Sequence, residues 1–95
     1  MRDRITLADL QAQCDRLNRH FGYALKPYSP SEDGVIKPNP RVFHISQAYG
    51  GVAIHQMAES GTGVRDVIGF GHAPKREVYD RLVSLIDGVM LEARQ

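Results

Sequence analysis

The sequence predicts an α+β fold in which a three-stranded antiparallel meander carries two helices on one face, an α-β-β-β-α two-layer sandwich. The first observation behind it is a pair of alternating apolar runs, within residues 41–57, that flank Tyr49-Gly50-Gly51-Val52. A two-glycine link between such runs indicates a hairpin, because both central residues of a type I′ turn need positive φ. The second is helical periodicity near both ends of the chain. The third is the length of 95 residues, which suits one domain, 1–95, with a single core.

The first helix is expected over about residues 6–21. Thr6 is a suitable N-cap, Asp9 lies near the positive end of the helix dipole, and Gly22 supplies a left-handed stop. One face carries the apolar residues Leu10, Cys14, Leu17 and Phe21, with Cys14 read as a small core residue. The other side is expected to be solvated and carries Gln11, Asp15, Arg16, Asn18 and Arg19.

The segment 23–40 is expected to be a long loop, because its four prolines exclude a helix. Asp33-Gly34 predicts a turn, and Val35-Ile36 is suited to a short edge strand beside part of residues 23–26. A connection of this length in a small domain is either a binding loop or a mobile segment.

The two strands of the hairpin are expected over about 41–49 and 52–59. With Gly50-Gly51 as the loop, Tyr49 pairs with Val52, and residues of matching parity share a face. The face predicted to lie against the core holds Phe43, Ile45, Tyr49, Val52 and Ile54. The face predicted to be open to solvent holds His44, Ser46, Ala48, Ala53, His55 and Met57.

A third strand is expected over about 64–70, with Val64, Ile68 and Phe70 pointing inward, and a final helix over about 74–93 that begins near Pro74. The final helix carries two adjacent apolar stripes, one of Val78, Leu82, Leu85 and Val89 and one of Tyr79, Val83, Ile86 and Met90. Either this helix contacts both the sheet and the first helix, or its flank forms a homodimer contact.

No group of residues forms a clear catalytic or metal-binding pattern. His44 and His55 would share the open face, and His72 joins them only if the third strand ends close by, but no thiolate or carboxylate completes a tetrahedral set. Ser46 beside His55 resembles half of a nucleophile–base pair, yet a flat sheet face offers no oxyanion hole. We therefore expect no enzyme activity, no catalytic residue, no metal and no cofactor.

A nucleic-acid-binding module is the alternative interpretation. Residues 69–76 place a Gly-x-Gly before a helix that starts with Lys75 and Arg76, and helix N-termini attract anions. Double-stranded RNA-binding domains share the order helix, three strands, helix, with a basic cluster at this point. Arg16 and Arg19 add positive charge on the first helix, but the formal net charge is only +1. A purely structural turn before the final helix is the competing interpretation.

The composition favours a protein of the cytoplasm. The N-terminal residues contain no apolar signal-peptide core, and no run approaches the about 18 apolar residues that a membrane-spanning helix needs. The single Cys14 fits a reducing compartment. We expect no association with a membrane.

Several short motifs resemble those of short proteins of unknown function that are encoded in tailed-phage and prophage genomes. These motifs are Leu17-Asn18-Arg19, Pro27-Tyr28, Phe43-His44-Ile45, Ala48-Tyr49-Gly50-Gly51, Gly63-Val64, Asp66-Val67 and the segment 79–88. The resemblance implies a phage-related gene and action in the cytoplasm of a bacterial host, by contact with a host protein such as a component of antiviral defence. The candidate contact residues are Tyr28, Lys37, His44, Ser46 and His55.

Overall fold

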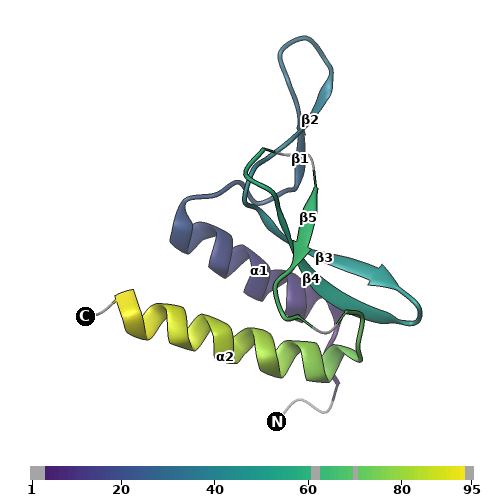
Figure 1. Ribbon diagram of the computed structural model, residues 1–95, viewed down its shortest axis with the longest axis vertical. Coiled ribbons are helices and arrows are strands. Elements are labelled where there is room, and N and C mark those ends of the chain that lie inside the picture. The colour runs from purple at the N-terminus through teal and green to yellow at the C-terminus, as the bar shows by residue number, and fades with distance from the viewer. Residues whose placement is uncertain (1–3, 61–62, 70, 94–95) are drawn as a thin grey trace.

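The computed structural model describes residues 4–60, 63–69 and 71–93 and confirms the α+β fold (Figure 1). Its helices are α1 (Leu7–Phe21) and α2 (Lys75–Ala93), and its strands are β1 (Tyr28–Pro30), β2 (Ile36–Pro38), β3 (Phe43–Ala48), β4 (Gly51–Met57) and β5 (Val64–Asp66). The antiparallel sheet β3-β4-β5 is the predicted meander. The pair β1-β2 forms a second sheet inside the segment predicted to be a loop, and it projects from the rest of the molecule.

Both helices pack on one face of the meander. α1 contacts β3, α2 contacts β4, and the two helices contact each other, as one of the two interpretations of the final helix predicted. The core cluster consists of Ile5, Leu10, Cys14, Leu17, Phe43, Val52, Ile54, Ala73, Val78, Leu82 and Ile86. In α2 the fully buried side chains are Val78 and Leu82, from one predicted stripe, and Ile86, from the other, whereas Leu85 is 36% exposed.

The ends of α1 follow the predicted pattern. Thr6 and Asp9 form a reciprocal capping box, and Gly22 ends the helix with φ of 76°. The prediction that Asn18 is solvated is wrong, because its side chain is fully buried. Its Nδ2 donates to the carbonyl oxygen of Phe43 over 2.9 Å, and its Oδ1 accepts from the Phe43 N–H over 2.8 Å.

The central hairpin has the predicted type of turn, but one residue earlier. Tyr49 and Gly50 have φ of 55° and 74°, as a type I′ turn requires, and Ala48 pairs with Gly51. The cause lies outside the hairpin. A Cβ on Gly51 would come within 2.9 Å of the Ala73 carbonyl oxygen, because Val52 and Ala73 exchange two backbone hydrogen bonds of 2.9 Å. Gly51 is thus needed where the chain passes beside it.

This change of register moves one predicted core residue to the surface. The observed pairs, such as Ile45 with Ile54, differ by two residues from the predicted pairs, so each strand keeps its predicted faces. Tyr49, however, lies in the turn and is 97% exposed, so its predicted place in the core is wrong.

The opposite face of the meander is only partly open. Ala53 and Met57, predicted to face solvent, are buried, and so is Val42, which lies on the same face. The N–H of Arg41 donates to the Met57 carbonyl, while the Met57 N–H donates to that of Val42. With φ of 69° at Arg41, this is a G1-type bulge, with arginine in the position that glycine usually takes.

The third strand is shorter than predicted. β5 ends at Asp66, and Val64 is 50% exposed rather than inward; the prediction for Phe70 lies outside the described residues. The Asp66 carboxylate accepts hydrogen bonds from the N–H groups of Ile68, Gly69 and Gly71 over 2.7–3.1 Å. These bonds fold the chain after β5 into a loop that returns to β4 at Ala73.

Candidate partner-binding surfaces

The projecting hairpin, here called the arm (residues 27–39), is closed at its base and its tip by local hydrogen bonds. At the base, the Asn39 N–H donates to the Pro27 carbonyl oxygen over 2.7 Å, and near the tip the Ser31 N–H donates to the Val35 carbonyl oxygen over 2.9 Å. Ile36 pairs with Pro30, not with residues 23–26, so the predicted partner of this short strand is wrong. The sequence indicated the turn at Asp33-Gly34 and a strand after it, but not the strand before it, since prolines weaken a strand prediction.

Two of the three prolines of the arm, Pro30 and Pro38, occupy the positions where a strand tolerates them. In an antiparallel ladder, bonded and non-bonded pairs alternate, and the bonded pairs here include Pro27 with Asn39 and Ser31 with Val35. Pro30 and Pro38 therefore fall in non-bonded pairs, where a backbone N–H would point away from the partner strand. Their rings protect the outer edges of the arm from further strand pairing.

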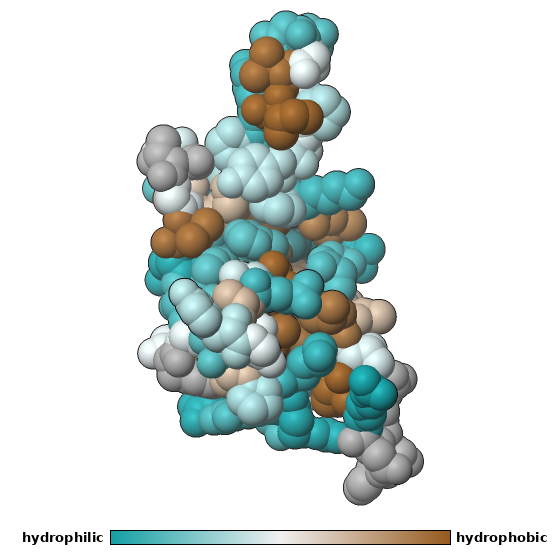
Figure 2. All heavy atoms as spheres, turned by 90° about the vertical axis from the view of Figure 1, so that its right-hand side faces the viewer, coloured by the Kyte–Doolittle hydropathy of each residue, from teal (hydrophilic) through white to brown (hydrophobic). Residues whose placement is uncertain are grey.

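The two faces of the arm differ in polarity. Pairing places Tyr28, Pro30, Ile36 and Pro38 on one face, and all four are exposed. The other face carries Ser29, Ser31, Val35, Lys37 and Asn39. The predicted contact residues Tyr28 and Lys37 thus lie on opposite faces. Tyr28, Val35 and Ile36 are 53%, 54% and 61% exposed, and Figure 2 shows hydrophobic side chains gathered near the end of the projection.

The tip of the arm is held by a polar turn. The Ser31 hydroxyl hydrogen-bonds the Asp33 carboxylate, which also accepts from the Val35 N–H over 3.2 Å. The hydrogen bond from Ser31 and that from the Val35 backbone hold the pKa of Asp33 below its usual value. A charged, hydrogen-bonded turn next to exposed Val35 gives the tip a defined shape.

A row of four rings crosses the second candidate surface, the polar face of the meander. The ring centroids of His44 and His55 are 5.9 Å apart, those of His55 and His72 6.0 Å, and those of His72 and Tyr49 5.8 Å. All three contacts are edge-to-face. The loop folded by Asp66 brings His72 into this row, which the sequence allowed only on the condition that β5 ended nearby.

Ser46 contacts a different histidine from the predicted one. Its Oγ lies 3.0 Å from Nε2 of His72, not of His55. Ser46 pairs with Ala53 on β4, and His72 comes from the far side of β4, so the imidazole must pass over Ala53. The imidazole above it explains why residue 53 is small and buried. The backbone N–H groups of the adjacent loop are bonded to Asp66, so they are not placed as an oxyanion hole.

The electrostatics of this face favour a neutral His44. Burial lowers the pKa of His44 and the positive charge of His55 lowers it further, while a backbone hydrogen bond at Ile45 opposes both. Nε2 of His44 is buried without a hydrogen-bond partner. Burial raises the pKa of Asp66, but the N–H groups of Gly69, Gly71 and Ile68 outweigh it and make the net shift downward. Across the described ranges, no three His, Cys, Asp or Glu side chains are grouped to hold a metal ion.

The basic residues proposed for nucleic-acid binding do not gather in one patch. Lys75 lines a hollow with residues 4–7, so the start of α2 lies beside the start of α1. Arg16 and Arg19 follow about 14 and 18 Å further along α1, at 1.5 Å per residue. The carboxylate of Asp66 already occupies the backbone donors of the Gly-x-Gly loop, which supports the structural interpretation of this turn over phosphate binding.

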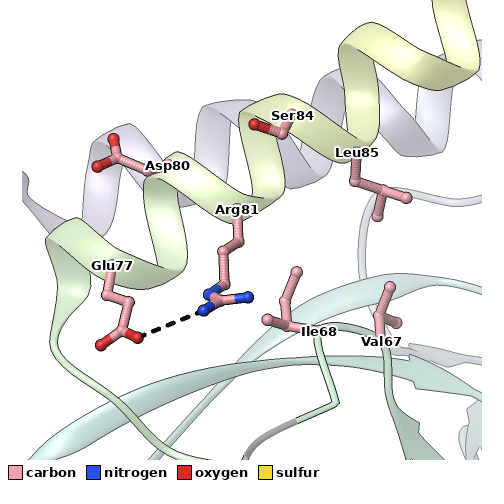
Figure 3. Close-up of a pocket in the computed structure, with 7 residues that line it drawn as sticks. All are labelled: Val67, Ile68, Glu77, Asp80, Arg81, Ser84 and Leu85. Carbon is pink, nitrogen blue, oxygen red and sulfur yellow. Dashed lines mark ion pairs between the residues drawn. The ribbon is translucent and has the colours of Figure 1, made fainter.

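A hollow of about 680 Å³ lies between α2 and the chain that follows β5 (Figure 3). Val67, Ile68 and Leu85 supply its apolar walls. Glu77 and Arg81 form an ion pair of 3.8 Å along its rim, with both side chains about half exposed. It is an open groove with mixed charge, and none of the predicted contact residues lines it.

Comparison of the chain with protein-family models, curated proteins and solved structures found no match. Neither helix, within the part of the chain that the structure describes, is long and apolar enough to span a membrane. The function must therefore be inferred from the chemistry of the surfaces described above.

Proposed function

We propose that this chain is a non-enzymatic binding protein, of the kind that phages and prophages encode, and that it acts in the host cytoplasm by contact with a host protein. A component of antiviral defence is the class of target that we favour. The observation that carries the proposal is the apolar face of the arm. Its exposed side chains, Tyr28 and Ile36 with the two flanking prolines, contribute nothing to the core cluster.

Exposed apolar side chains on a shaped projection are suited to insertion into a pocket of a partner. A surface of four side chains is smaller than the about 800 Å² that each partner contributes to a standard interface. The target must therefore surround the arm or also contact the body of the protein. The base of the arm offers a second contact, since Lys26 and Pro27 line a hollow of about 360 Å³ together with His44.

The proposal is tested by affinity capture from bacterial lysate with the tagged protein, with and without nuclease. We expect one stoichiometric host protein to be captured by the wild type and lost with Ile36→Ser. Leu91→Ser is the matched control, because Leu91 is 58% exposed but lies on α2. Capture that Ile36→Ser leaves unchanged would contradict a role for the arm.

Nucleic-acid binding is the second candidate, and the ring row favours it. Tyr49 and the histidine rings could stack on bases, and Lys75 follows three residues after His72. The test is the double variant Lys75→Glu with Arg76→Glu. If nucleic acid is the target, the variant loses binding and the wild type binds less tightly as salt is raised. Capture of a protein that survives nuclease would reject this candidate.

A further inference from the structure

The backbone of β3 has hydrogen-bonding groups that face away from the sheet. β3 lies at one edge, and His44, Ser46 and Ala48 form the bonded pairs with β4. The alternation of an antiparallel ladder then directs the N–H and C=O groups of Phe43, Ile45 and Gln47 outward. The two bonds between Phe43 and Asn18 confirm this direction independently.

Asn18 closes only the first part of this edge. Its side-chain amide donates to and accepts from one residue, as the backbone of a neighbouring strand would. Further along, no described residue forms a hydrogen bond with the outward backbone groups of Gln47, and the Ile45 backbone is approached by the imidazole of His44, its neighbour on the same strand. The open part of the edge borders a hollow of about 320 Å³ lined by Leu7, Ala8, Gln11, Ile45 and Gln47.

This stretch also lacks the features that usually protect a sheet edge. The outer positions of the arm carry prolines, and β5 is three residues long and carries Arg65 and Asp66. β3 from Phe43 to Ala48 contains no proline, lysine or carboxylate, and its bulge lies before it. An edge without protection is a template for pairing with another extended chain.

We propose that β3 binds an extended segment of a partner protein as an additional strand. The segment pairs with Ile45 and Gln47 and places one apolar side chain in the hollow beside the start of α1. This inference rests on the proposed function and specifies the form of the partner. A second copy of the chain is a poor occupant, because α1 packs on β3. Edge-to-edge strands about 4.8 Å apart would bring two helices closer than their usual 8–10 Å.

The experiment selects peptides from a random twelve-residue display library on the wild-type protein and measures their affinity as synthetic peptides. Gln47→Pro removes the outward N–H and leaves the ladder with β4 intact, because Gln47 lies in a non-bonded pair. Gln47→Thr keeps the N–H and serves as the matched control. We expect selected peptides to bind the control like the wild type and Gln47→Pro at least tenfold more weakly. In the complex, amide exchange at Ile45 and Gln47 should slow.

If Gln47→Pro does not fold, Ala8→Trp replaces it, because a large side chain from α1 fills the hollow without changing the backbone of β3. The inference is overturned if no peptide is enriched, or if peptides bind equally well to the blocked variant. Peptides that depend on Ile36 alone would overturn it while supporting the arm as the contact surface. Self-association that Gln47→Pro abolishes would show that the occupant is a second copy, which overturns the inference as stated.

Discussion

Replacement of Asn18 by alanine should be one of the most damaging single changes on α1. The substitution leaves the N–H and C=O of Phe43 without their partners in a buried position. Each unsatisfied buried group costs about 1–3 kcal/mol, so the expected loss for the two groups is about 2–6 kcal/mol. Against a typical domain stability of about 5–15 kcal/mol, this is a large fraction.

The assay is urea unfolding at 25 °C followed by far-ultraviolet circular dichroism, together with thermal melting. At about 4–8 °C per kcal/mol for a chain of this size, we expect the midpoint of thermal unfolding to fall by at least about 8 °C. Gln11→Ala is the control on the same helix, because it removes only an exposed hydrogen bond to Asp15. Its effect should stay within about 0.5 kcal/mol.

A second variant separates the hydrogen bonds from the volume of the side chain. Asn18→Leu restores the buried volume but not the two bonds, so it should be about as unstable as Asn18→Ala. A loss below about 1 kcal/mol for the alanine variant would refute the reasoning. Recovery of stability in the leucine variant would show that packing, rather than the amide, is what the position needs.

Three further outcomes are expected. Gly50→Asn should change the free energy of unfolding by less than about 1 kcal/mol, because asparagine tolerates positive φ. Gly51→Ala should lower it by about 1–3 kcal/mol, because the added Cβ meets the Ala73 backbone at 2.9 Å, and equal melting temperatures for the two variants would contradict this. The lowered pKa of His44 means that the unfolded chain binds a proton more readily, so stability should fall as pH drops below about 6.5, and His44→Gln should reduce that fall in urea titrations at pH 7 and pH 5. Burial, with a smaller contribution from the Asp15 charge, raises the pKa of Cys14 to about 12, so a thiol reagent at pH 8 should label it only as fast as the protein unfolds; immediate labelling of the folded protein would count against this.

The parts of the fold that depend on local chemistry were predictable from the sequence. Thr6 and Gly22 mark the ends of α1, because the Thr6 side chain caps the first turn and the Gly22 backbone takes the left-handed conformation that ends the helix. The helical stripes and the alternating hairpin gave the element order and the core face. The type I′ conformation of the turn was predicted for the same reason, since two adjacent residues with positive φ are a local requirement, but its position was predicted one residue too late.

The errors arose where a residue serves a distant part of the chain. Gly51 looks like a turn residue, but it is needed because Ala73 passes beside it, 22 positions later. Asn18 looks like part of a solvated helix face, but its partner is Phe43, 25 residues away. A polar residue on the border of an apolar helical stripe was the only available signal.

The candidate site was predictable in part for the same reasons. His44, Ser46 and His55 share a face because strand parity places them there, and the structure agrees. The addition of His72 and Tyr49 depended on the loop around Asp66 and on the exact turn, neither of which parity determines. The apolar face of the arm was hidden because its two prolines argued against a strand, although they occupy its non-bonded positions.

The closed base of the arm has a consequence for how this protein can diversify. The hydrogen bond between Asn39 and Pro27 brings the two ends of the arm together, and the residues between them contribute nothing to the core cluster. Sequence change in the arm is therefore separated from the folding of the body. The body acts as a constant frame, and the arm can acquire new residues, lengths or targets, much as a hypervariable loop does on a conserved scaffold.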